Sequence, residues 1–253
     1  MPARRPAVLL HGWPGSTHDY DEVADSLREH ADLLVPDLLR EEGGATDRAD
    51  RVFGQMAERG FERAIVVGYD VGSRVAQALA RKRPQAVERL VLSPPLPGVG
   101  ERVLSPHAQA EFWYQPFHQL ALADALIDGN EPAVRAYLGH FWHHWSGPDW
   151  TVPADAFERL IARYAEPGAF TASISWYRAG AGTVAQAMAK RPPEARLDTP
   201  TTVLWGTHDP LFPTAWADRL DDHFAAATLH ILDRVGHFVP LEAPQAVVDA
   251  ILT

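Results

Sequence analysis

One aspartate lies where its type and its neighbours indicate nucleophilic chemistry. Asp70 is the centre of Gly68-Tyr69-Asp70-Val71-Gly72, which follows the apolar run Ala64 to Val67 and precedes a helix-like stretch. Glycines on both sides allow a sharp turn from strand to helix that exposes the central side chain. A carboxylate that attacks a saturated carbon becomes an ester, which activated water can cleave. The other interpretation is that Asp70 only caps the following helix, a position that aspartate favours.

A histidine and a second aspartate could complete this chemistry. His237, in Gly236-His237-Phe238, could take a proton from the attacking water, because imidazole titrates near neutral pH. Asp209, in Trp205-Gly206-Thr207-His208-Asp209-Pro210, follows an apolar run and could accept a hydrogen bond from the far ring nitrogen. Asp209-Pro210 is also a good turn former. The order nucleophile, acid, histidine leaves room for a large insertion before the acid.

Short apolar runs flanked by turn residues predict the strands that would position these side chains. We expect each run to form a buried strand; the runs are Ala7 to Leu10, Asp32 to Val35, Ala64 to Val67, Arg89 to Leu92, Thr201 to Trp205 and Thr228 to Leu232. Helix-like stretches lie between the early runs, at Tyr20 to His30, Ala49 to Arg59 and Ser73 to Arg83. This alternation predicts an α/β fold with a mostly parallel sheet covered by helices on both faces.

The alternation stops between Ser93 and about Pro193, where aromatic-rich, helix-like sequence replaces it. This block predicts an inserted helical cap. Proline-rich turns at 93–98 and 191–193 mark the junctions, because proline stops helices and restricts the preceding residue. We therefore expect a core of residues 1–93 and 194–253, a cap of residues 94–193, and a pocket between them.

Composition narrows the classes of partner. The chain has 253 residues and a net charge of -10, from 23 basic and 33 acidic residues, which disfavours a surface that tracks nucleic-acid phosphates. The absence of cysteine excludes disulfides and thiol catalysis. The apolar run before His11 is too short for a signal sequence or a membrane span. We expect a cytoplasmic protein with a neutral or weakly polar substrate, and no nucleic-acid or membrane partner.

Paired histidines in Phe141-Trp142-His143-His144-Trp145 raise the question of a metal site. Adjacent residues point to different faces of a helix or strand, so the pair is poorly placed to share one ion. An aromatic cluster in the cap is the better interpretation. We expect no metal and no cofactor.

Four motifs together resemble the alpha/beta-hydrolase superfamily: His11-Gly12-Trp13-Pro14, the turn around Asp70, the Asp209 motif and the His237 motif. The resemblance covers nearly the whole chain. It implies a catalytic triad of Asp70, Asp209 and His237, with an oxyanion hole formed by the backbone N–H groups of Trp13 and Val71.

The chain departs from this family at its start. Family members usually have two further strands before the His-Gly loop, so we expect the sheet to lack those two strands. A sheet that begins at the third family strand has an exposed edge, which a partner subunit in a homo-oligomer could cover.

Within the superfamily, an aspartate nucleophile is similar to epoxide hydrolases, haloalkane dehalogenases and fluoroacetate dehalogenases. The two dehalogenase families typically place tryptophan or arginine directly after the nucleophile, whereas Val71 offers neither a side-chain donor nor a charge. The sequences Phe112-Trp113-Tyr114-Gln115 and Ser175-Trp176-Tyr177-Arg178 resemble the two cap motifs of epoxide hydrolases. This resemblance implies that Tyr114 and Tyr177 donate to an epoxide oxygen, although cap tyrosines often serve only packing.

The expected function is therefore hydrolysis of a small hydrophobic epoxide to a vicinal diol, with water as co-substrate and an ester on Asp70. We expect Trp113, Trp176 and Phe238 to line the pocket. Two alternatives stay open. One is a haloalkane or haloacid dehalogenase that uses the same triad, and the other is a non-catalytic small-molecule binding protein.

Overall fold

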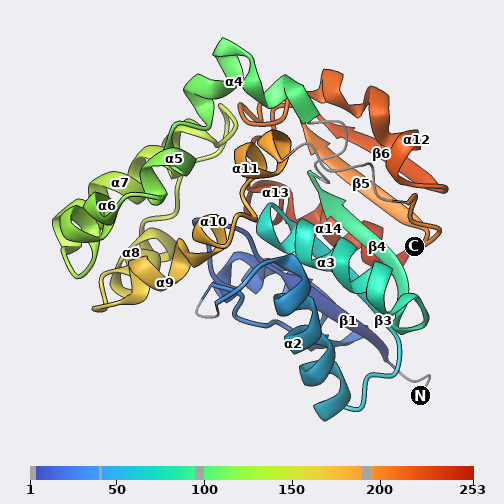
Figure 1. Cartoon of the computed structure of the whole chain (residues 1–253). Coiled ribbons are helices and arrows are strands. Elements are labelled where there is room, and N and C mark those ends of the chain that lie inside the picture. Colours follow the sequence, from blue (N-terminus) through green and yellow to red (C-terminus); the bar gives the residue numbers. More distant parts are fainter. Residues whose placement is uncertain (1–3, 40–41, 95–99, 190–194) are drawn as a thin grey trace.

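The computed structural model describes residues 4–39, 42–94, 100–189 and 195–253, and within them one parallel sheet organises the chain (Figure 1). Six strands of this described part lie in the order β2-β1-β3-β4-β5-β6, and each neighbouring pair is parallel. The strands are β1 (Arg5–Leu10), β2 (Ala31–Leu34), β3 (Ala64–Tyr69), β4 (Val87–Ser93), β5 (Thr201–Gly206) and β6 (Ala227–Leu232). The expected parallel sheet is confirmed, with every predicted strand present.

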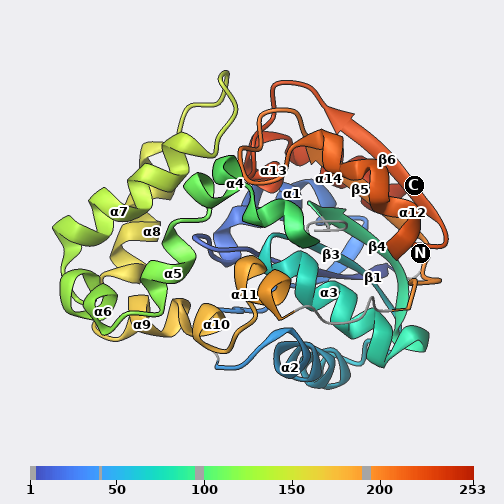
Figure 2. The same ribbon diagram turned by 45° about the horizontal axis from the view of Figure 1, so that its top comes forward.

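Helices cover both faces of this sheet, as the sequence predicts. In Figure 2, α2 and α3 pack together on one face, while α1 and α14 pack together on the other. The helices that follow or connect the strands are α1 (Asp21–Leu27), α2 (Ala45–Glu58), α3 (Val71–Lys82), α12 (Leu220–His223), α13 (Val239–Glu242) and α14 (Pro244–Leu252). Short 3-10 turns add η1 (Thr17–Tyr20), η2 (Pro84–Ala86), η3 (Gly100–Leu104) and η4 (Thr214–Arg219).

Two helix boundaries differ from the expectation for physical reasons. The predicted helix from Tyr20 to His30 is shorter in the structure, because Tyr20 ends a 3-10 turn capped by Ser16 and α1 runs from Asp21 to Leu27. Helix α2 begins at Ala45 rather than Ala49, because the Asp47 carboxylate accepts from the backbone N–H of Gly44 and so caps the helix at that point.

Burial separates the central strands from the edges. All six residues of β3 are buried, whereas β6 exposes 38% of Leu229 and 48% of Ile231. The expectation of a buried strand is therefore wrong for β6, because it lies at one edge of the sheet and its middle residues are exposed. Strand β2 forms the opposite edge and is only partly buried. The suggestion that a partner subunit covers an edge stays a prediction.

A layer of helices connects β4 to β5 and lies beyond one end of the sheet (Figure 2). We call these the cap helices: α4 (Pro106–Glu111), α5 (Tyr114–His118), α6 (Ala121–Ile127), α7 (Glu131–His144), α8 (Ala154–Tyr164), α9 (Ala169–Ser173), α10 (Ser175–Arg178) and α11 (Thr183–Met188). The predicted cap boundaries at 94 and 193 stay a prediction, since residues 95–98 and 191–193 of the proposed junctions lie outside the described residues. Throughout the described part, helices long and apolar enough to cross a membrane are absent.

Candidate active site

Asp70 lies at a strained turn between β3 and α3. Its backbone has φ 49° and ψ -118°, a left-handed conformation that costs a non-glycine residue about 1–3 kcal/mol. Two glycines permit this turn. A Cβ on Gly72 would lie 1.9 Å from the carbonyl oxygen of Leu10, and a Cβ on Gly68 would lie 2.4 Å from the carbonyl oxygen of Gly72. The turn therefore presents the Asp70 side chain beyond the end of β3 only because both positions lack a side chain.

The Asp70 carboxylate does not cap the helix that follows it. Asp70 occupies the N-cap position of α3, but its side chain makes no capping hydrogen bond. Its Oδ1 instead accepts a hydrogen bond of 2.9 Å from the backbone N–H of Trp13, in the loop after β1. The helix-cap interpretation is thus wrong, and the carboxylate is held by a loop that is far away in the sequence.

His237 and Asp209 lie beside this carboxylate. The Nδ1 of His237 donates to Oδ2 of Asp209 at 2.8 Å, and Nε2 of His237 lies 3.5 Å from Oδ2 of Asp70. Asp209 Oδ1 also accepts from the backbone N–H groups of Leu211 and Phe212 at 2.9 and 3.2 Å. Asp209 therefore forms the predicted turn and orients the imidazole at the same time. The structure brings all three predicted triad residues together.

The charge on His237 follows from its two acidic neighbours. Burial alone would lower the pKa of this imidazole, but Asp209 and Asp70 outweigh burial and raise the pKa to about 10. Below that pH, the resting site holds an imidazolium between two carboxylates. Any change that neutralises Asp70 removes part of this stabilisation and lowers the pKa of His237.

The two backbone amides predicted to form an oxyanion hole belong to Trp13, in the loop after β1, and to Val71, which follows Asp70. The N–H of Trp13 already contacts Oδ1 of Asp70. Val71 is the first residue of α3, so its N–H belongs to the first turn, where amides have no acceptor within the helix. The side chain of Val71 is buried and apolar, and it offers no donor to an anion. The assignment of both amides to an oxyanion hole stays a prediction.

The two cap tyrosines converge on the ring of Trp13. Tyr114 stacks on that indole, with ring centroids 5.3 Å apart and planes 12° apart, and Tyr177 meets it edge-on at 5.7 Å. The two phenol rings contact each other at 5.6 Å in a perpendicular arrangement. Burial raises the pKa of both hydroxyls, and the negative charge of Asp70 raises them further. Both phenols thus remain protonated near neutral pH, close enough to Asp70 to sense its charge.

The three predicted pocket residues have different surroundings. Phe238 is buried against Trp142, Trp145 and His237. Trp176 is buried beneath the guanidinium group of Arg48 on α2. Trp113 is 42% exposed and stacks on Phe141 of α7. Trp113 thus packs on a cap helix and Trp176 against core helix α2, and their role as pocket residues stays a prediction.

Several neighbours of the site give no signal in the sequence. The carbonyl of Trp145, at the end of α7, accepts from the backbone N–H of His237 at 2.7 Å, and its ring lies 5.2 Å from the imidazole. The carboxylate of Glu242 accepts from the N–H groups of Gly147 and Gly236 at 2.7 Å. These contacts join the cap to the histidine loop. Trp145 falls within the predicted aromatic cluster, but no local pattern distinguishes Glu242 from other surface acids.

A pocket of about 270 Å³ opens beside Tyr177, between α5 and α11. Its walls include Gln115, Gly182, Val184 and Met188, so most of the lining is apolar. Gln115 connects this pocket to the site, because its side-chain oxygen accepts from the N–H of Val184 at 3.0 Å while its Nε2 donates to the hydroxyl of Tyr114 at 3.3 Å. A small apolar molecule could approach the tyrosines here.

A metal site needs several histidine, cysteine or acidic side chains that converge on one point. Among the residues of the described part, no group of three or more histidine, cysteine or acidic side chains is arranged to hold an ion. His143 and His144 lie at the end of α7, where His144 contacts Glu111 at 2.7 Å and His140 stacks on His144.

Comparison with known proteins gives the same fold class. The model of the Alpha/beta hydrolase family matches residues 7–250. A soluble epoxide hydrolase from a Corynebacterium strain is 29% identical over 98% of this chain and 88% of its own length. Haloalkane dehalogenase 2 from Mycobacterium bovis is 26% identical over 98% of this chain and 86% of its own length.

A solved structure extends the comparison to the fold. The structure of a Bacillus megaterium epoxide hydrolase in complex with an inhibitor superposes with a TM-score of 0.80 over 99% of this chain and 93% of that one, at 18% identity. Identity at this level shows a shared fold alone. Because the family model spans nearly the whole sequence, the chain belongs to the alpha/beta hydrolase family, and it is a hydrolase.

Proposed function

We propose that this hydrolase opens a small hydrophobic epoxide to a vicinal diol through an ester on Asp70. The observation that carries the proposal is the convergence of two buried, protonated phenols on the indole of Trp13, whose own backbone N–H binds the Asp70 carboxylate. An opening epoxide develops alkoxide character and needs a donor that keeps its proton at neutral pH. Tyr114 and Tyr177 provide two such donors.

In the first step, Oδ2 of Asp70 attacks one epoxide carbon from the face opposite the ring oxygen. The carbon–oxygen bond of the ring breaks, and the two phenols stabilise the oxygen while one of them gives it a proton. The phenolate that forms is protonated again with the proton that His237 loses before the second step. A hydroxyalkyl ester of Asp70 results. Oδ1, which the Trp13 amide holds at 2.9 Å, becomes the carbonyl oxygen of that ester.

In the second step, His237 activates water for attack on the ester carbonyl carbon. Ester formation removes the negative charge of Asp70, one of the groups that raise the pKa of His237. The imidazole therefore loses its proton more readily at the stage where a base is needed. Asp209 keeps the ring oriented, and the amides of Trp13 and Val71 stabilise the oxyanion before the diol departs and the carboxylate is restored.

Similarity to the Corynebacterium epoxide hydrolase supports this choice of reaction. Dehalogenation is the second candidate, supported by the similarity to haloalkane dehalogenase 2. One structural feature also favours it. The ring of Trp145 lies against both His237 and Tyr114, where an indole could donate to a departing halide.

A single-turnover reaction in heavy-oxygen water tests the ester mechanism. With enzyme in excess over an epoxide, we expect the first diol to carry oxygen from Asp70 and the Asp70 peptide to gain the solvent label. Solvent label in the first diol with an unlabelled Asp70 would contradict the proposal. Parallel assays with epoxides and haloalkanes separate the two reactions, because halide release that survives replacement of both tyrosines by phenylalanine would favour dehalogenation.

The same experiment addresses the binding-protein alternative. A binding protein would take up a hydrophobic ligand, release no diol or halide, and keep its affinity in Asp70→Ala. Loss of all product formation in Asp70→Ala, with normal product formation in the unaltered chain, would exclude that alternative.

A further inference from the structure

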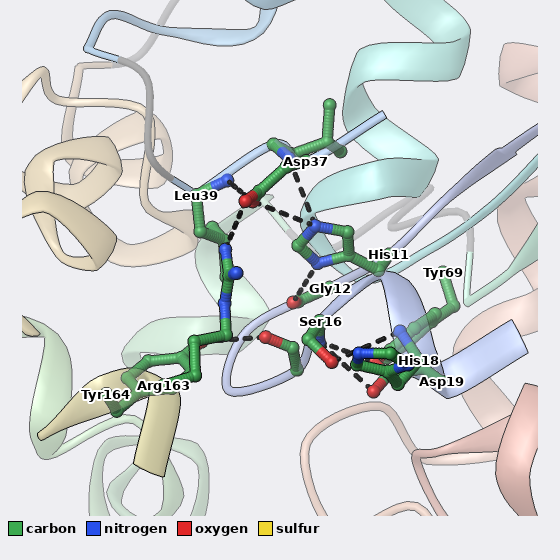
Figure 3. Close-up of polar contacts among 12 residues, drawn as sticks. His11, Gly12, Ser16, His18, Asp19, Asp37, Leu39, Tyr69, Arg163 and Tyr164 are labelled. Carbon is green, nitrogen blue, oxygen red and sulfur yellow. Dashed lines mark hydrogen bonds and ion pairs between the residues drawn. The ribbon is translucent and has the colours of Figure 1, made fainter. Parts of the chain in front are cut away.

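The loop after β1, residues 11–16, carries the amide that binds Asp70, and other core residues hold its two ends. At the first end, Nδ1 of His11 donates to the carbonyl of Gly12 at 3.1 Å, while Nε2 accepts from the N–H of Leu38 at 3.0 Å. At the other end, the N–H of Ser16 donates to the carboxylate of Asp19 at 3.1 Å. Figure 3 shows both groups of contacts along this loop. The middle of the loop contains Trp13, Pro14 and Gly15.

Two cap helices hold this middle part by its carbonyl groups. The indole N–H of Trp142 on α7 donates to the carbonyl of Pro14 at 2.7 Å. The hydroxyl of Tyr164 on α8 donates to the carbonyl of Gly15 at 2.9 Å. In Figure 3, Tyr164 extends from α8 toward this loop, while its neighbour Arg163 extends toward Asp37. Pro14 has no N–H of its own, so its carbonyl is its one backbone hydrogen-bonding group.

The side chain of Trp13 adds a third connection to the cap. Its indole N–H donates to the hydroxyl of Ser173 on α9 at 3.3 Å. Its ring is enclosed by Tyr114 and by His118, whose ring meets it edge-on at 4.8 Å. The residue that supplies the amide for Asp70 is therefore embedded in the cap, together with the tyrosine proposed to open the ring.

Burial makes these hydrogen bonds effective constraints. Trp142 and Tyr164 are each only 2% exposed. A buried carbonyl that loses its donor costs about 1–3 kcal/mol, so the loop cannot leave this position cheaply. A catalytic donor must also be held to within about 0.5 Å of its working geometry. The cap donors thus restrict the position of the Trp13 amide, which lies two peptide units before the bound carbonyl of Pro14 and three before that of Gly15.

We propose that Trp142 and Tyr164 are positioning residues that hold the Trp13 amide in the oxyanion hole, so that docking of the cap completes the hole. This inference rests on the proposed function, because it assigns the amide to the ester intermediate. Neither side chain takes part in bond making. Trp142 acts through the carbonyl of Pro14, the residue after Trp13. Tyr164 acts through the carbonyl of Gly15, one residue further along the chain.

The two chemical steps respond differently to this amide. In ester formation, the Asp70 oxygen bound by the amide begins with carboxylate charge and loses it, so the amide gives little net acceleration. In ester hydrolysis, the same oxygen begins as a neutral carbonyl and gains negative charge, so the amide stabilises the transition state. Displacement of the amide therefore slows hydrolysis more than ester formation.

The test compares Trp142→Phe, Tyr164→Phe and the double variant with the unaltered chain. Rapid quenching and mass spectrometry of the Asp70 peptide give the rate of each step with an epoxide substrate. We expect ester hydrolysis to slow by about 10- to 100-fold in each single variant, below the loss of about 10²- to 10³-fold that follows removal of an oxyanion donor. Ester formation should change by less than about threefold, so the ester accumulates in the steady state.

Arg102→Gln is the matched control for cap docking. Arg102 forms an ion pair of 2.7 Å between η3 and Asp218 of η4, a cap–core contact that does not involve the loop. It should leave both rates unchanged. Tyr164→Phe removes a single oxygen atom, so it keeps the test valid if Trp142→Phe does not fold.

Two outcomes would overturn the inference without touching the proposed function. The first is an unchanged rate of ester hydrolysis in Tyr164→Phe and the double variant, and the second is equal slowing of both steps. Failure of the proposed function has a different signature, because the unaltered chain would then form no ester on Asp70 with any epoxide.

Discussion

Nε2 of His237 faces Oδ2 of Asp70 at 3.5 Å, a distance beyond a good hydrogen bond, while both side chains are largely enclosed. The other carboxylate oxygen, Oδ1, is bound by the amide of Trp13. The two oxygens of one carboxylate thus have different neighbours, and in the proposed mechanism this difference assigns attack to Oδ2 and the future carbonyl to Oδ1. The predictions below follow from that division.

Replacement of His237 by glutamine should separate the two steps. The nucleophile remains, so one equivalent of ester should form on Asp70, but water is no longer activated and turnover should fall by at least about 10³-fold. Intact-protein mass spectrometry after mixing with an epoxide measures the added mass. His230→Gln, at an exposed position of β6, is the control and should turn over normally. Normal turnover without ester in His237→Gln would remove His237 from the mechanism.

Replacement of Tyr114 or Tyr177 by phenylalanine should slow ring opening and leave hydrolysis of an existing ester nearly unchanged. Each variant should lose about 10- to 10²-fold in the rate of ester formation, because one of two donors remains, and the double variant should lose more. Quenched-flow measurement of ester formation checks this. Tyr20→Phe is the control, since its buried hydroxyl donates to the carbonyl of Leu10 at 3.1 Å, within the core. Equal rates in the double variant and the unaltered chain would remove the phenols from ring opening.

The pH dependence of the two steps should differ. The pKa of His237 is raised to about 10 in the free protein, so the imidazolium form predominates below that pH. The ester lacks the charge of Asp70, so the pKa of His237 falls in the intermediate, and ester hydrolysis should rise with pH through that lower pKa. Ester formation needs no neutral imidazole and should persist to lower pH, so acid should make the ester accumulate.

A nuclear magnetic resonance titration provides an independent check of this charge coupling. Asp70→Asn imitates the neutral ester, and the pKa of His237 should be lower in this variant than in the unaltered chain. An identical pKa in both proteins would show that Asp70 does not control the charge of His237.

Two glycine-to-alanine substitutions, one near Asp70 and one in α2, should have opposite effects on the free energy of unfolding. Gly72→Ala should destabilise the fold by more than about 3 kcal/mol, because a Cβ would lie 1.9 Å from the carbonyl oxygen of Leu10 and the backbone would have to move. Gly54→Ala is the control within α2, where an added Cβ meets no atom within 4 Å. It should stabilise the protein by about 0.5–1 kcal/mol, the difference in helix propensity. Urea denaturation of both variants measures these changes, and similar values for the two would contradict the close-approach argument.

Local sequence was sufficient for most of the framework. Apolar runs bounded by turn residues predicted every strand, because a strand buried between helices must be apolar on both faces. The same reasoning predicted that β6 exists but was wrong about its burial. Residues Thr228 to Leu232 resemble those of a buried strand, although β6 lies at an edge of the sheet. Position in the sheet is set by which strands pair, and no short segment records that pairing.

The sequence by itself determined the nucleophile's turn, the order of Asp70, Asp209 and His237, and the two tyrosine motifs, because each depends on neighbouring residues or on a family pattern. Only the tertiary structure decided that Asp70 binds the Trp13 amide instead of capping α3. It also decided that both phenols meet on the Trp13 ring, and that Trp142 and Tyr164 bind carbonyls of the loop after β1. The physical reason is distance along the chain. These contacts join residues separated by 57 to 164 positions, so they form only when the sheet assembles and the cap packs against it.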